Sequence, residues 1–505
     1  MSTSAMGTWV GHWATTRPEA EALVFLEHRF TWAQLGARVE ARAAALCELG
    51  VEPGDRVACL MFNRPEAIEL LWACQRIGAI YVPINHRLTA PELRDVLEDA
   101  DPRVLWVEPE LAELAAAGAP AGLSVVDVGS LDAVGAVLPR PAVVPPVVAL
   151  ALDDTAIILY TSGTTGRSKG AMISHGNVLA STRLWMAEFG LTAAERPLIG
   201  MPLCFTGGLL AASMPSIAAG AAIVLMRSFN AEEALRLIEA ERTTWMTAVP
   251  TMLERMVADV TWASRDLSSL RGMQAGGAAV PIPLIQAFHH RGIGLQSAYG
   301  LTEASAGANL YVPASEALRK RGAIGRPTVD HEARVRRSDG CDAEVGEVGE
   351  LLLRGPLVFA GYWRNPEATS ETIVDGWLRT GDLVTIDEDG YYFVAGRAKD
   401  MVISGGLNVY PVEVERVLDQ FPGVAESSVI GLADERWGET VVACLRLEPG
   451  ADGLDEAALL EHCKASLGDY KVPRRFVVVE DFPRTMSGKV RKQELRESIE
   501  AGAAT

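Results

Sequence analysis

The chain has 505 residues, of which 49% are hydrophobic and 22% charged, close to the composition of a soluble globular protein. This apolar content excludes an intrinsically disordered chain and a small disulfide-stapled scaffold. Lys and Arg number 46 against 65 Asp and Glu, a formal net charge of −19, which disfavours sequence-independent binding to nucleic acid or anionic lipid. The length suggests about three domains, or one large domain and a smaller one.

The cysteines and the apolar segments predict a cytoplasmic protein. The seven cysteines are scattered and form no C-x-x-C pair, as expected for reduced thiols rather than a disulfide framework or a zinc site. The N-terminus lacks the basic start and apolar stretch of a secretion signal. The uncharged stretch 201–226 is long enough to cross a bilayer, but prolines and glycines interrupt it. We expect a buried helix, turn and strand there, and no membrane span.

Strand-like and helix-like segments alternate from residue 156 onward, which predicts an α/β fold with largely parallel sheets. By contrast, residues 111–146 are rich in Ala, Val, Gly and Pro with weak periodicity, and we expect an irregular excursion there. The expected strands are 156–160, 222–226, 244–248, 271–275 and 293–298, and the expected helices begin at 174 and 250 or span 231–241 and 281–291.

The last fifth of the chain differs from the rest in its sequence pattern, which predicts a small α+β domain. A charged turn at 396–400 precedes a helix-like segment at 412–420 and strand-like segments at 427–431 and 441–447. We place the boundary near Gly396, giving an N-terminal domain 1–395 and a C-terminal domain 396–505.

A glycine-rich loop follows the first of these strands. Residues 160–170 read Tyr-Thr-Ser-Gly-Thr-Thr-Gly-Arg-Ser-Lys-Gly. Glycines let backbone N–H groups approach an anion, hydroxyls donate further hydrogen bonds, and Lys169 supplies a positive charge. The loop therefore predicts a polyphosphate site, the alternative being a plain Ser/Gly surface loop. It is not a Walker A loop, because Gly170 follows Lys169, and the G-x-S-x-G match at 166–170 does not follow a strand directly, as a hydrolase elbow would.

This loop resembles the signature of the adenylate-forming superfamily, which includes acyl-CoA synthetases, peptide-synthetase adenylation domains and luciferases. Matches run from about residue 30 to 492. The chain length and the Ala-Leu-Arg-Lys…Gly-Arg run at 317–326 are similar to those of bacterial fatty-acyl-CoA and feruloyl-CoA synthetases. The resemblance implies a large N-terminal α/β domain with stacked sheets, a small C-terminal domain that rotates about a hinge, and formation of an acyl-adenylate before a thioester. The other motifs follow in the expected order: Gly276-Gly-Ala278, Tyr299-Gly-Leu-Thr-Glu303, Gly361-Tyr-Trp363, Trp377-Leu-Arg-Thr-Gly-Asp382, Gly396-Arg-Ala-Lys399 and Pro483-Arg-Thr-Met-Ser-Gly-Lys489.

The resemblance implies a role for individual residues in ATP binding. Thr302 would donate to the α-phosphate, Glu303 with Thr161 would hold Mg²⁺, and Asp382 would accept the ribose hydroxyls with Arg397 nearby. The residues implied to cradle the β- and γ-phosphates are Thr161, Ser162, Gly163, Thr164, Thr165, Gly166 and Lys169. Those implied to line the adenine are Gly277, Ala278, Ala298, Tyr299 and Gly300.

The C-terminal motifs imply catalytic and hinge residues. Lys489 would bridge the substrate carboxylate and the α-phosphate, and Lys399 would be the hinge. The stretch Ser404, Gly405, Gly406 would line a channel for the pantetheine arm of CoA. Each residue alone has an ordinary explanation, such as a turn aspartate at 382 or a solvated loop lysine at 489.

The implied acyl pocket is bordered by small residues, and Phe205 stands where the family usually has histidine. No Arg or Lys lies among them to pair with a second carboxylate, and no Asp is placed to hold an ammonium group. We therefore expect an apolar acid, either aromatic of hydroxycinnamate type or a medium-to-long-chain fatty acid, and leave the choice open. The pocket residues are Phe205, Gly207, Gly208, Gly276, Gly277, Ala306 and Gly307.

Three functions are compatible with the motifs. We favour an acyl-CoA synthetase that uses ATP, Mg²⁺ and CoA. The alternative is a stand-alone adenylation enzyme that passes the acyl group to a carrier-protein thiol or another nucleophile. A non-catalytic nucleotide-binding relic is disfavoured because the implied Lys169, Glu303, Asp382 and Lys489 are all present. A homodimer remains open.

Overall fold

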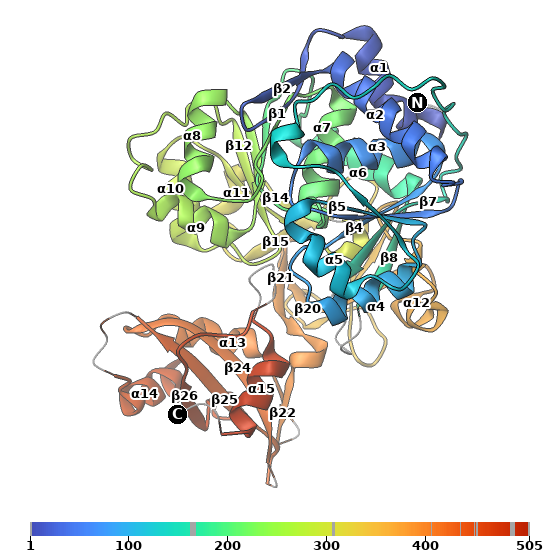
Figure 1. Ribbon diagram of the computed structural model, residues 1–505. Helices are drawn as coiled ribbons and strands as arrows, with labels where there is room; N and C mark the ends of the chain where they lie inside the picture. Colours follow the sequence, from blue (N-terminus) through green and yellow to red (C-terminus); the bar gives the residue numbers. More distant parts are fainter. Residues whose placement is uncertain are drawn as a thin grey trace. The chain divides into compact units, whose positions relative to one another are not determined.

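The computed structural model describes residues 3–161, 168–305, 309–405, 407–434, 436–448, 450, 453–484 and 490–502. The chain forms two compact units (Figure 1). The first comprises residues 1–321, 325–332 and 353–378, and the second comprises 322–324, 333–352 and 379–505. The predicted α/β class, with a large N-terminal and a small C-terminal part, is confirmed. The boundary near Gly396 stays a prediction.

The first sheet of the first unit has a parallel block with the neighbour order β13, β12, β11, β9, β10, β1. Antiparallel strands flank it, β14 and then β15 beside β13, and β2 beside β1. The bounds are β1 Glu21–Phe25, β2 His28–Thr31, β9 Pro197–Ile199, β10 Ile223–Leu225, β11 Trp245–Ala248, β12 Gly272–Gly276, β13 Leu295–Tyr299, β14 Leu310–Val312 and β15 Ala323–Pro327. The parallel strands carry apolar runs because both of their faces are buried.

The second sheet of this unit has the strand order β18, β8, β7, β4, β3, β5, β6. The strands from β7 to β6 are parallel, whereas β8 and β18 run antiparallel to their neighbours. The bounds are β3 Arg56–Leu60, β4 Ile80–Ile84, β5 Val104–Val107, β6 Ser124–Asp127, β7 Thr155–Thr161, β8 Lys169–Ser174 and β18 Gly361–Tyr362. A short β19, Ile373–Val374, lies outside this sheet and pairs with β20, Trp377–Ile386.

The prediction of an irregular excursion over 111–146 is wrong in its first half. Residues 112–118 form α5, and Ser124–Asp127 forms β6, which pairs with β5. Backbone pairing with a buried neighbour compensates there for the weak side-chain pattern. After the 3₁₀ turn Leu131–Ala133, residues 134–150 contain neither helix nor strand.

Several helices of the first unit begin at a residue whose side chain caps the first turn. The Ser174 hydroxyl accepts from the Asn177 N–H at the start of α6, and the Asn230 side chain accepts from the Glu233 N–H at the start of α8, each such cap being worth about 1 kcal/mol. The predicted ranges between 156 and 298 agree with the observed elements to within two residues. The helices are α1 Trp9–Thr16, α2 Trp32–Glu48, α3 Pro65–Ile77, α4 Ala90–Ala100, α5 Ala112–Gly118, α6 His175–Phe189, α7 Met214–Ala219, α8 Ala231–Glu241, α9 Pro250–Ala258, α10 Ile282–His290, α11 Ala314–Ala317 and α12 Pro366–Thr372.

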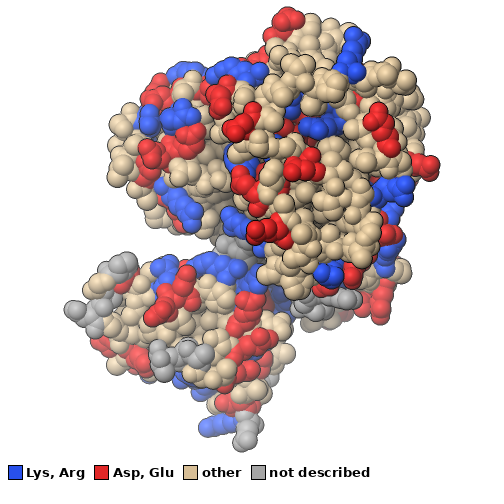
Figure 2. Space-filling view, in the orientation of Figure 1, with Lys and Arg blue, Asp and Glu red and all other residues tan. Residues whose placement is uncertain are grey.

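The uncharged stretch 201–226 forms a π-helical segment Gly207–Ser213, then α7 and β10, most of them buried. The expected helix, turn and strand are therefore confirmed. Among the described residues, no helix combines the length and apolar character that a membrane crossing needs. On the face drawn in Figure 2, Lys and Arg side chains are interspersed with Asp and Glu.

The second unit is built around two groups of strands. One has the neighbour order β16, β17, β20, β21, and the other has β23, β22, β25, β24 with β26 beside β25. The helix and strands predicted at 412–420, 427–431 and 441–447 are confirmed as α13, β24 and β25. The bounds are β16 Glu332–Arg336, β17 Gly349–Arg354, β20 Trp377–Ile386, β21 Tyr392–Arg397, β22 Val402–Ser404, β23 Leu407–Val409, α13 Pro411–Leu418, β24 Val424–Asp434, β25 Gly438–Leu447, α14 Glu456–Ser466, β26 Arg475–Val478 and α15 Lys492–Glu500.

Candidate active site

The glycine-rich motif connects β7 and β8, whose antiparallel pairing brings its two ends together. Thr161 lies opposite Lys169, and the Thr161 hydroxyl donates a 3.4 Å hydrogen bond to the Lys169 carbonyl oxygen. A hydroxyl and an ammonium group thus lie at the base of the hairpin. The predicted cradle residues Ser162, Gly163, Thr164, Thr165 and Gly166 lie outside the described residues.

Tyr362 joins Lys169 to Glu303. It lies in β18, opposite Ala171 of β8. Its phenol donates a 2.8 Å hydrogen bond to Oε1 of Glu303, and the Lys169 Nζ lies 5.2 Å from the centre of its ring. Burial, reinforced by the Glu303 carboxylate, raises the pKa of Tyr362 well above its usual range, so the phenol is a neutral donor. Three segments far apart in the sequence therefore meet at one aromatic ring.

Glu303 lies in the 3₁₀ turn Thr302–Ala304, directly after β13. The Phe359 N–H donates a 2.9 Å hydrogen bond to the Glu303 carbonyl oxygen, and the Ser305 hydroxyl donates one of 2.8 Å to the Leu357 carbonyl oxygen. No group of three or more His, Cys, Asp or Glu side chains suited to a metal occurs in the described part of the chain. One carboxylate beside the implied phosphate site would fit Mg²⁺, which takes one or two protein carboxylates together with substrate phosphates.

The carboxyl ends of β12 and β13 bring the implied adenine residues together. Gly276 is paired with Ala298, and a Cβ atom on Gly276 would lie 3.0 Å from the Ala298 carbonyl oxygen. Gly277 has a φ of +84°, a backbone conformation that favours glycine, and it is exposed, as is Ala278. Tyr299 ends β13 and Gly300 follows it. This edge carries small side chains that leave room for a flat ring.

The segment around Phe205 packs tightly against its own backbone. The Leu209 N–H donates to the Phe205 carbonyl oxygen, and a Cβ atom on Gly208 would lie 2.7 Å from the Met201 carbonyl oxygen. Gly208 is therefore needed for the close approach, and Gly207 likewise faces the Met201 side chain. The pocket residues Ala306 and Gly307 lie outside the described residues.

A residue that the sequence analysis missed holds this segment in place. The Asn63 Nδ2 donates 3.0 Å hydrogen bonds to the carbonyl oxygens of Met201 and Met226, and its Oδ1 accepts one of 2.8 Å from the Leu203 N–H. No local pattern identifies such a long-range contact.

The second unit contains the implied ribose site. Asp382 and Arg397 are paired across β20 and β21, and Arg397 Nε lies 2.6 Å from Asp382 Oδ1. Asp382 is buried. Lys399 follows β21 and lies in a 3₁₀ turn. Burial lowers the pKa of Lys399, and Arg397 adds to this effect while Asp400 and Asp382 oppose it. Lys489 lies outside the described residues.

The implied thiol-channel residues lie in the hairpin between β22 and β23. Gly405 has a φ of +60°, its N–H donates a 2.8 Å hydrogen bond to the Trp437 carbonyl oxygen, and a Cβ atom there would lie 3.0 Å from the Trp437 ring. Ser404 is buried, and Gly406 lies outside the described residues. The sequence analysis assigned no role to Trp437.

Two arginine side chains lie over the Trp437 ring. The guanidinium carbons of Arg474 and Arg436 lie 4.1 and 4.8 Å from its centre. Arg474 also lines a hollow of about 860 Å³ beside α14, together with Arg475 and Lys464. Glu456 and Asp469 line the same hollow, so this part of the second unit combines an aromatic ring with side chains of both charges.

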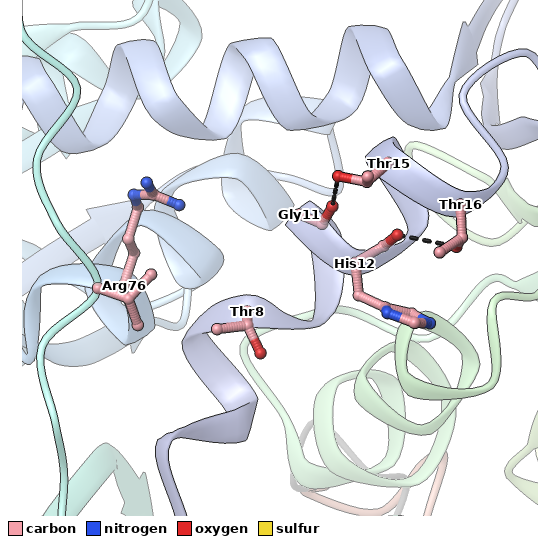
Figure 3. A pocket seen from close by; sticks show the side chains of 7 residues that line it. Thr8, Gly11, His12, Thr15, Thr16 and Arg76 are labelled. Atoms are coloured by element: carbon pink, nitrogen blue, oxygen red, sulfur yellow. Dashed lines mark hydrogen bonds between the residues drawn. The ribbon is translucent and has the colours of Figure 1, made fainter.

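A separate hollow of about 420 Å³ lies beside α1 in the first unit (Figure 3). Arg76 is among its lining residues, but its Nε donates to the Pro145 carbonyl oxygen, and the hydroxyls of Thr15 and Thr16 donate to carbonyl oxygens of their own helix. It shares no residue with the site predicted from the sequence, and we assign it no role.

The parallel sheets, the glycine-rich hairpin and the Lys169–Tyr362–Glu303 contact define a nucleotide-using enzyme of the adenylate-forming class. The AMP-binding enzyme family matches residues 10–363, and the AMP-binding enzyme C-terminal domain matches residues 413–489. The chain belongs to the AMP-binding enzyme family.

Several proteins that are similar to this chain over nearly its whole length are named as CoA ligases or CoA synthetases. Feruloyl-CoA synthase of Amycolatopsis sp is 40% identical over 496 residues, covering 98% of this chain and 99% of the relative. Long-chain-fatty-acid–CoA ligase of Mycobacterium tuberculosis is 36% identical over 494 residues, covering 97% of each. The o-succinylbenzoate CoA synthetase of Bacillus subtilis, solved with its acyl-adenylate intermediate, has a TM-score of 0.87 at 31% identity, covering 97% of this chain and 98% of that one. The protein is an acid–thiol ligase of the acyl-CoA synthetase branch and uses ATP, Mg²⁺ and CoA, as the sequence predicted.

Proposed function

We propose that the protein activates a largely apolar carboxylic acid as its acyl-adenylate and transfers the acyl group to CoA. In the first step a carboxylate oxygen attacks the α-phosphorus of ATP, and pyrophosphate leaves. In the second the CoA sulfur attacks the acyl carbon, AMP leaves, and the thiol proton goes to solvent. The observation that carries this proposal is the contact of Lys169, Tyr362 and Glu303 beside the glycine-rich hairpin.

The first unit would bind the triphosphate. Lys169 and Thr161, with the loop Ser162–Gly166 between them, would hold the β- and γ-phosphates, because an ammonium group and backbone N–H groups offset their charge. Glu303, with Thr161, would hold Mg²⁺, which when bound neutralises phosphate charge. Thr302 would donate to the α-phosphate. Tyr362 keeps the Glu303 carboxylate in one orientation and limits the movement of Lys169.

The adenine and the ribose of ATP would contact different sets of residues. The adenine would lie against the edge formed by Gly277, Ala278, Ala298, Tyr299 and Gly300, where small residues admit a flat ring. Asp382, held by Arg397, would accept the ribose hydroxyls. Lys489 would neutralise charge on the α-phosphate as it builds up in the transition state, and Lys399 would serve as the hinge.

CoA would bind to the second unit. Ser404, Gly405 and Gly406 offer a narrow backbone for the pantetheine arm. Trp437 lies against Gly405 and is flanked by Arg474 and Arg436. CoA carries an adenine ring and several phosphates, and an aromatic ring beside guanidinium groups suits both.

The acid is expected to be apolar along much of its length. Phe205 in place of the usual histidine removes a polar group from the pocket wall, and the small residues Gly207, Gly208 and Gly276 leave space. The relatives include ligases for ferulate and for long-chain fatty acids, which match the two classes predicted from the sequence.

The test is a CoA-dependent AMP-release assay over acetate, octanoate, palmitate, benzoate, 4-coumarate and malonate, with ATP–pyrophosphate exchange measured beside it. We expect thioester formation with one apolar acid and none with malonate. Exchange without a CoA thioester would contradict CoA as acceptor and favour a carrier-protein thiol. No exchange with any acid of a wider panel would overturn the proposal.

Location and assembly rest on the sequence. All seven cysteines are free thiols in the structure, which supports a reducing compartment, and we infer that the protein is cytoplasmic. A carrier protein and a homodimer stay predictions.

A further inference from the structure

One face of the first sheet carries a row of three polar side chains: Thr247 and Gln274, which are buried, and Gln296, which is half-buried. The parallel registers place Thr247 beside Gln274, and Gln274 beside Gln296. Paired residues of adjacent strands point to the same face of a sheet. The three side chains therefore form one transverse row across β11, β12 and β13.

Each side chain of this row has a buried polar atom without a hydrogen-bond partner among the described residues. These atoms are Oγ1 of Thr247, Nε2 of Gln274 and Oε1 of Gln296. Gln274 is only 2% exposed and Thr247 8%. Buried polar atoms are normally hydrogen-bonded, so three such atoms in one row indicate a place where a ligand supplies the partners.

The row lies on the face that carries the implied acyl pocket. Gly276 and Ala298 follow Gln274 and Gln296 by two residues on their strands, so they share the face and lie nearer the carboxyl edge of the sheet. Two residues of a strand span about 7 Å. The polar row is thus about 7 Å deeper than the pocket wall, along the direction in which an acid would extend from the site of chemistry.

The surroundings of the row are largely aromatic. Trp245 precedes Thr247 by two residues on the same face and packs with Ala298 and with Trp185 and Phe189 of α6. Phe189 lies 5.1 Å from Tyr311, edge to face, and 5.7 Å from Trp245. Such walls suit a flat ring, whereas the row offers neutral donors and acceptors and no charge.

From this arrangement we propose that Thr247, Gln274 and Gln296 select an aromatic acid bearing a neutral hydroxyl group on the ring, opposite the carboxylate. The inference rests on the proposed function, whose acid it narrows. A phenol can donate to Gln296 Oε1 and accept from Gln274 Nε2, with Thr247 as a further partner, because a hydroxyl both donates and accepts. An alkyl chain would leave all three atoms unpaired.

The experiment compares two acids that differ only in the hydroxyl, 4-hydroxycinnamate and cinnamate, with octanoate as the alkyl reference. ATP–pyrophosphate exchange gives kcat/KM for each acid. We expect the hydroxylated acid to be preferred by about tenfold or more over cinnamate. Gln274→Met and Gln296→Met keep the side-chain length but lose the amide, and each is expected to lower kcat/KM for 4-hydroxycinnamate by about tenfold and leave cinnamate little changed.

Gln75→Met is the matched control. Gln75 is a fully buried glutamine of α3 whose Nε2 donates to the Ala156 carbonyl oxygen, so its loss affects packing but not the ratio of the two acids. Equal use of cinnamate or octanoate by the unaltered enzyme would overturn the inference while leaving the proposed function intact. The same holds if the Met variants lose both acids in parallel. Absence of exchange with every acid would overturn both.

Discussion

The phenol of Tyr362 donates a 2.8 Å hydrogen bond to a carboxylate oxygen of Glu303. The two residues are 59 positions apart and meet because β18 adds to the edge of β8 while Glu303 lies just beyond β13. The same phenol ring faces the Lys169 ammonium. One neutral side chain thereby positions both the implied metal ligand and the implied phosphate lysine.

Tyr362→Phe removes this hydrogen bond and keeps the ring. We expect the Mg²⁺ concentration for half-maximal pyrophosphate exchange to rise by about tenfold, because partners behind a metal ligand tune its affinity on this scale. Titration of Mg²⁺ at saturating ATP measures the effect. Tyr81→Phe is the control, since the buried Tyr81 phenol donates to the Ala67 carbonyl oxygen and to no carboxylate. An unchanged Mg²⁺ requirement in Tyr362→Phe would remove the positioning role.

Trp437→Leu tests whether Trp437 contributes to the CoA-dependent half-reaction and not to adenylation. The variant loses the ring that Arg474 and Arg436 accompany. We expect the KM for CoA to rise by about two- to fivefold, in line with loss of one solvent-exposed cation–π contact worth about 0.5–1 kcal/mol, while pyrophosphate exchange stays near its original rate. Steady-state kinetics with CoA as the varied substrate decides. A parallel fall in exchange would show that Trp437 only supports the fold.

Lys489→Ala is expected to have the opposite effect. If Lys489 neutralises charge on the α-phosphate, its removal abolishes adenylation, a loss of about 10²-fold or more. Thioester formation from a supplied acyl-adenylate should largely survive. Both reactions can be followed by AMP and thioester release from the same preparation. Equal loss of the two would refute this division of labour.

Local patterns predicted the framework of the site well. The apolar run before the glycine-rich loop became β7, and the helices expected from 174 and over 231–241 are α6 and α8. These features depend on neighbours in sequence, so periodicity reveals them. The failure at Ser124–Asp127 has the converse cause, because that strand depends on pairing with β5.

Contacts between distant segments were beyond local patterns. The motif Gly361-Tyr-Trp was recognised, but the role of Tyr362 follows only from its pairing with β8 and its contact with Glu303. No local sequence pattern indicated a role for Asn63, because its partner Met201 lies in a distant segment. The same is true of Trp437, whose partner is Gly405. The row of Thr247, Gln274 and Gln296 likewise depends on the strand register.

Gly208→Ala should destabilise the fold. The added methyl group would meet the carbonyl oxygens of Pro202 and Met201, which are backbone atoms and cannot move aside cheaply. We expect the free energy of unfolding to fall by about 1–3 kcal/mol, as for other overpacked sites. Gly11→Ala is the matched control in α1, where an added Cβ meets no atom within 4 Å, and it should stabilise by about 0.5–1 kcal/mol. Urea unfolding of both variants provides the comparison, and equal stabilities would contradict the proposed crowding.

We predict that the folded protein loses stability in mild acid because of His175. It is 3% exposed at the start of α6, and burial lowers its pKa from 6.5 to about 4, with Asp154 opposing the shift. The unfolded chain therefore binds a proton below pH 6.5 that the folded chain refuses until about pH 4, so stability falls as the pH falls through this window. Between pH 7 and pH 5 the loss is about 2 kcal/mol. His175→Gln, which cannot titrate, should lose about that much less between pH 7 and pH 5 in urea unfolding. An identical pH dependence in the two proteins would mean that folding does not lower the pKa of His175.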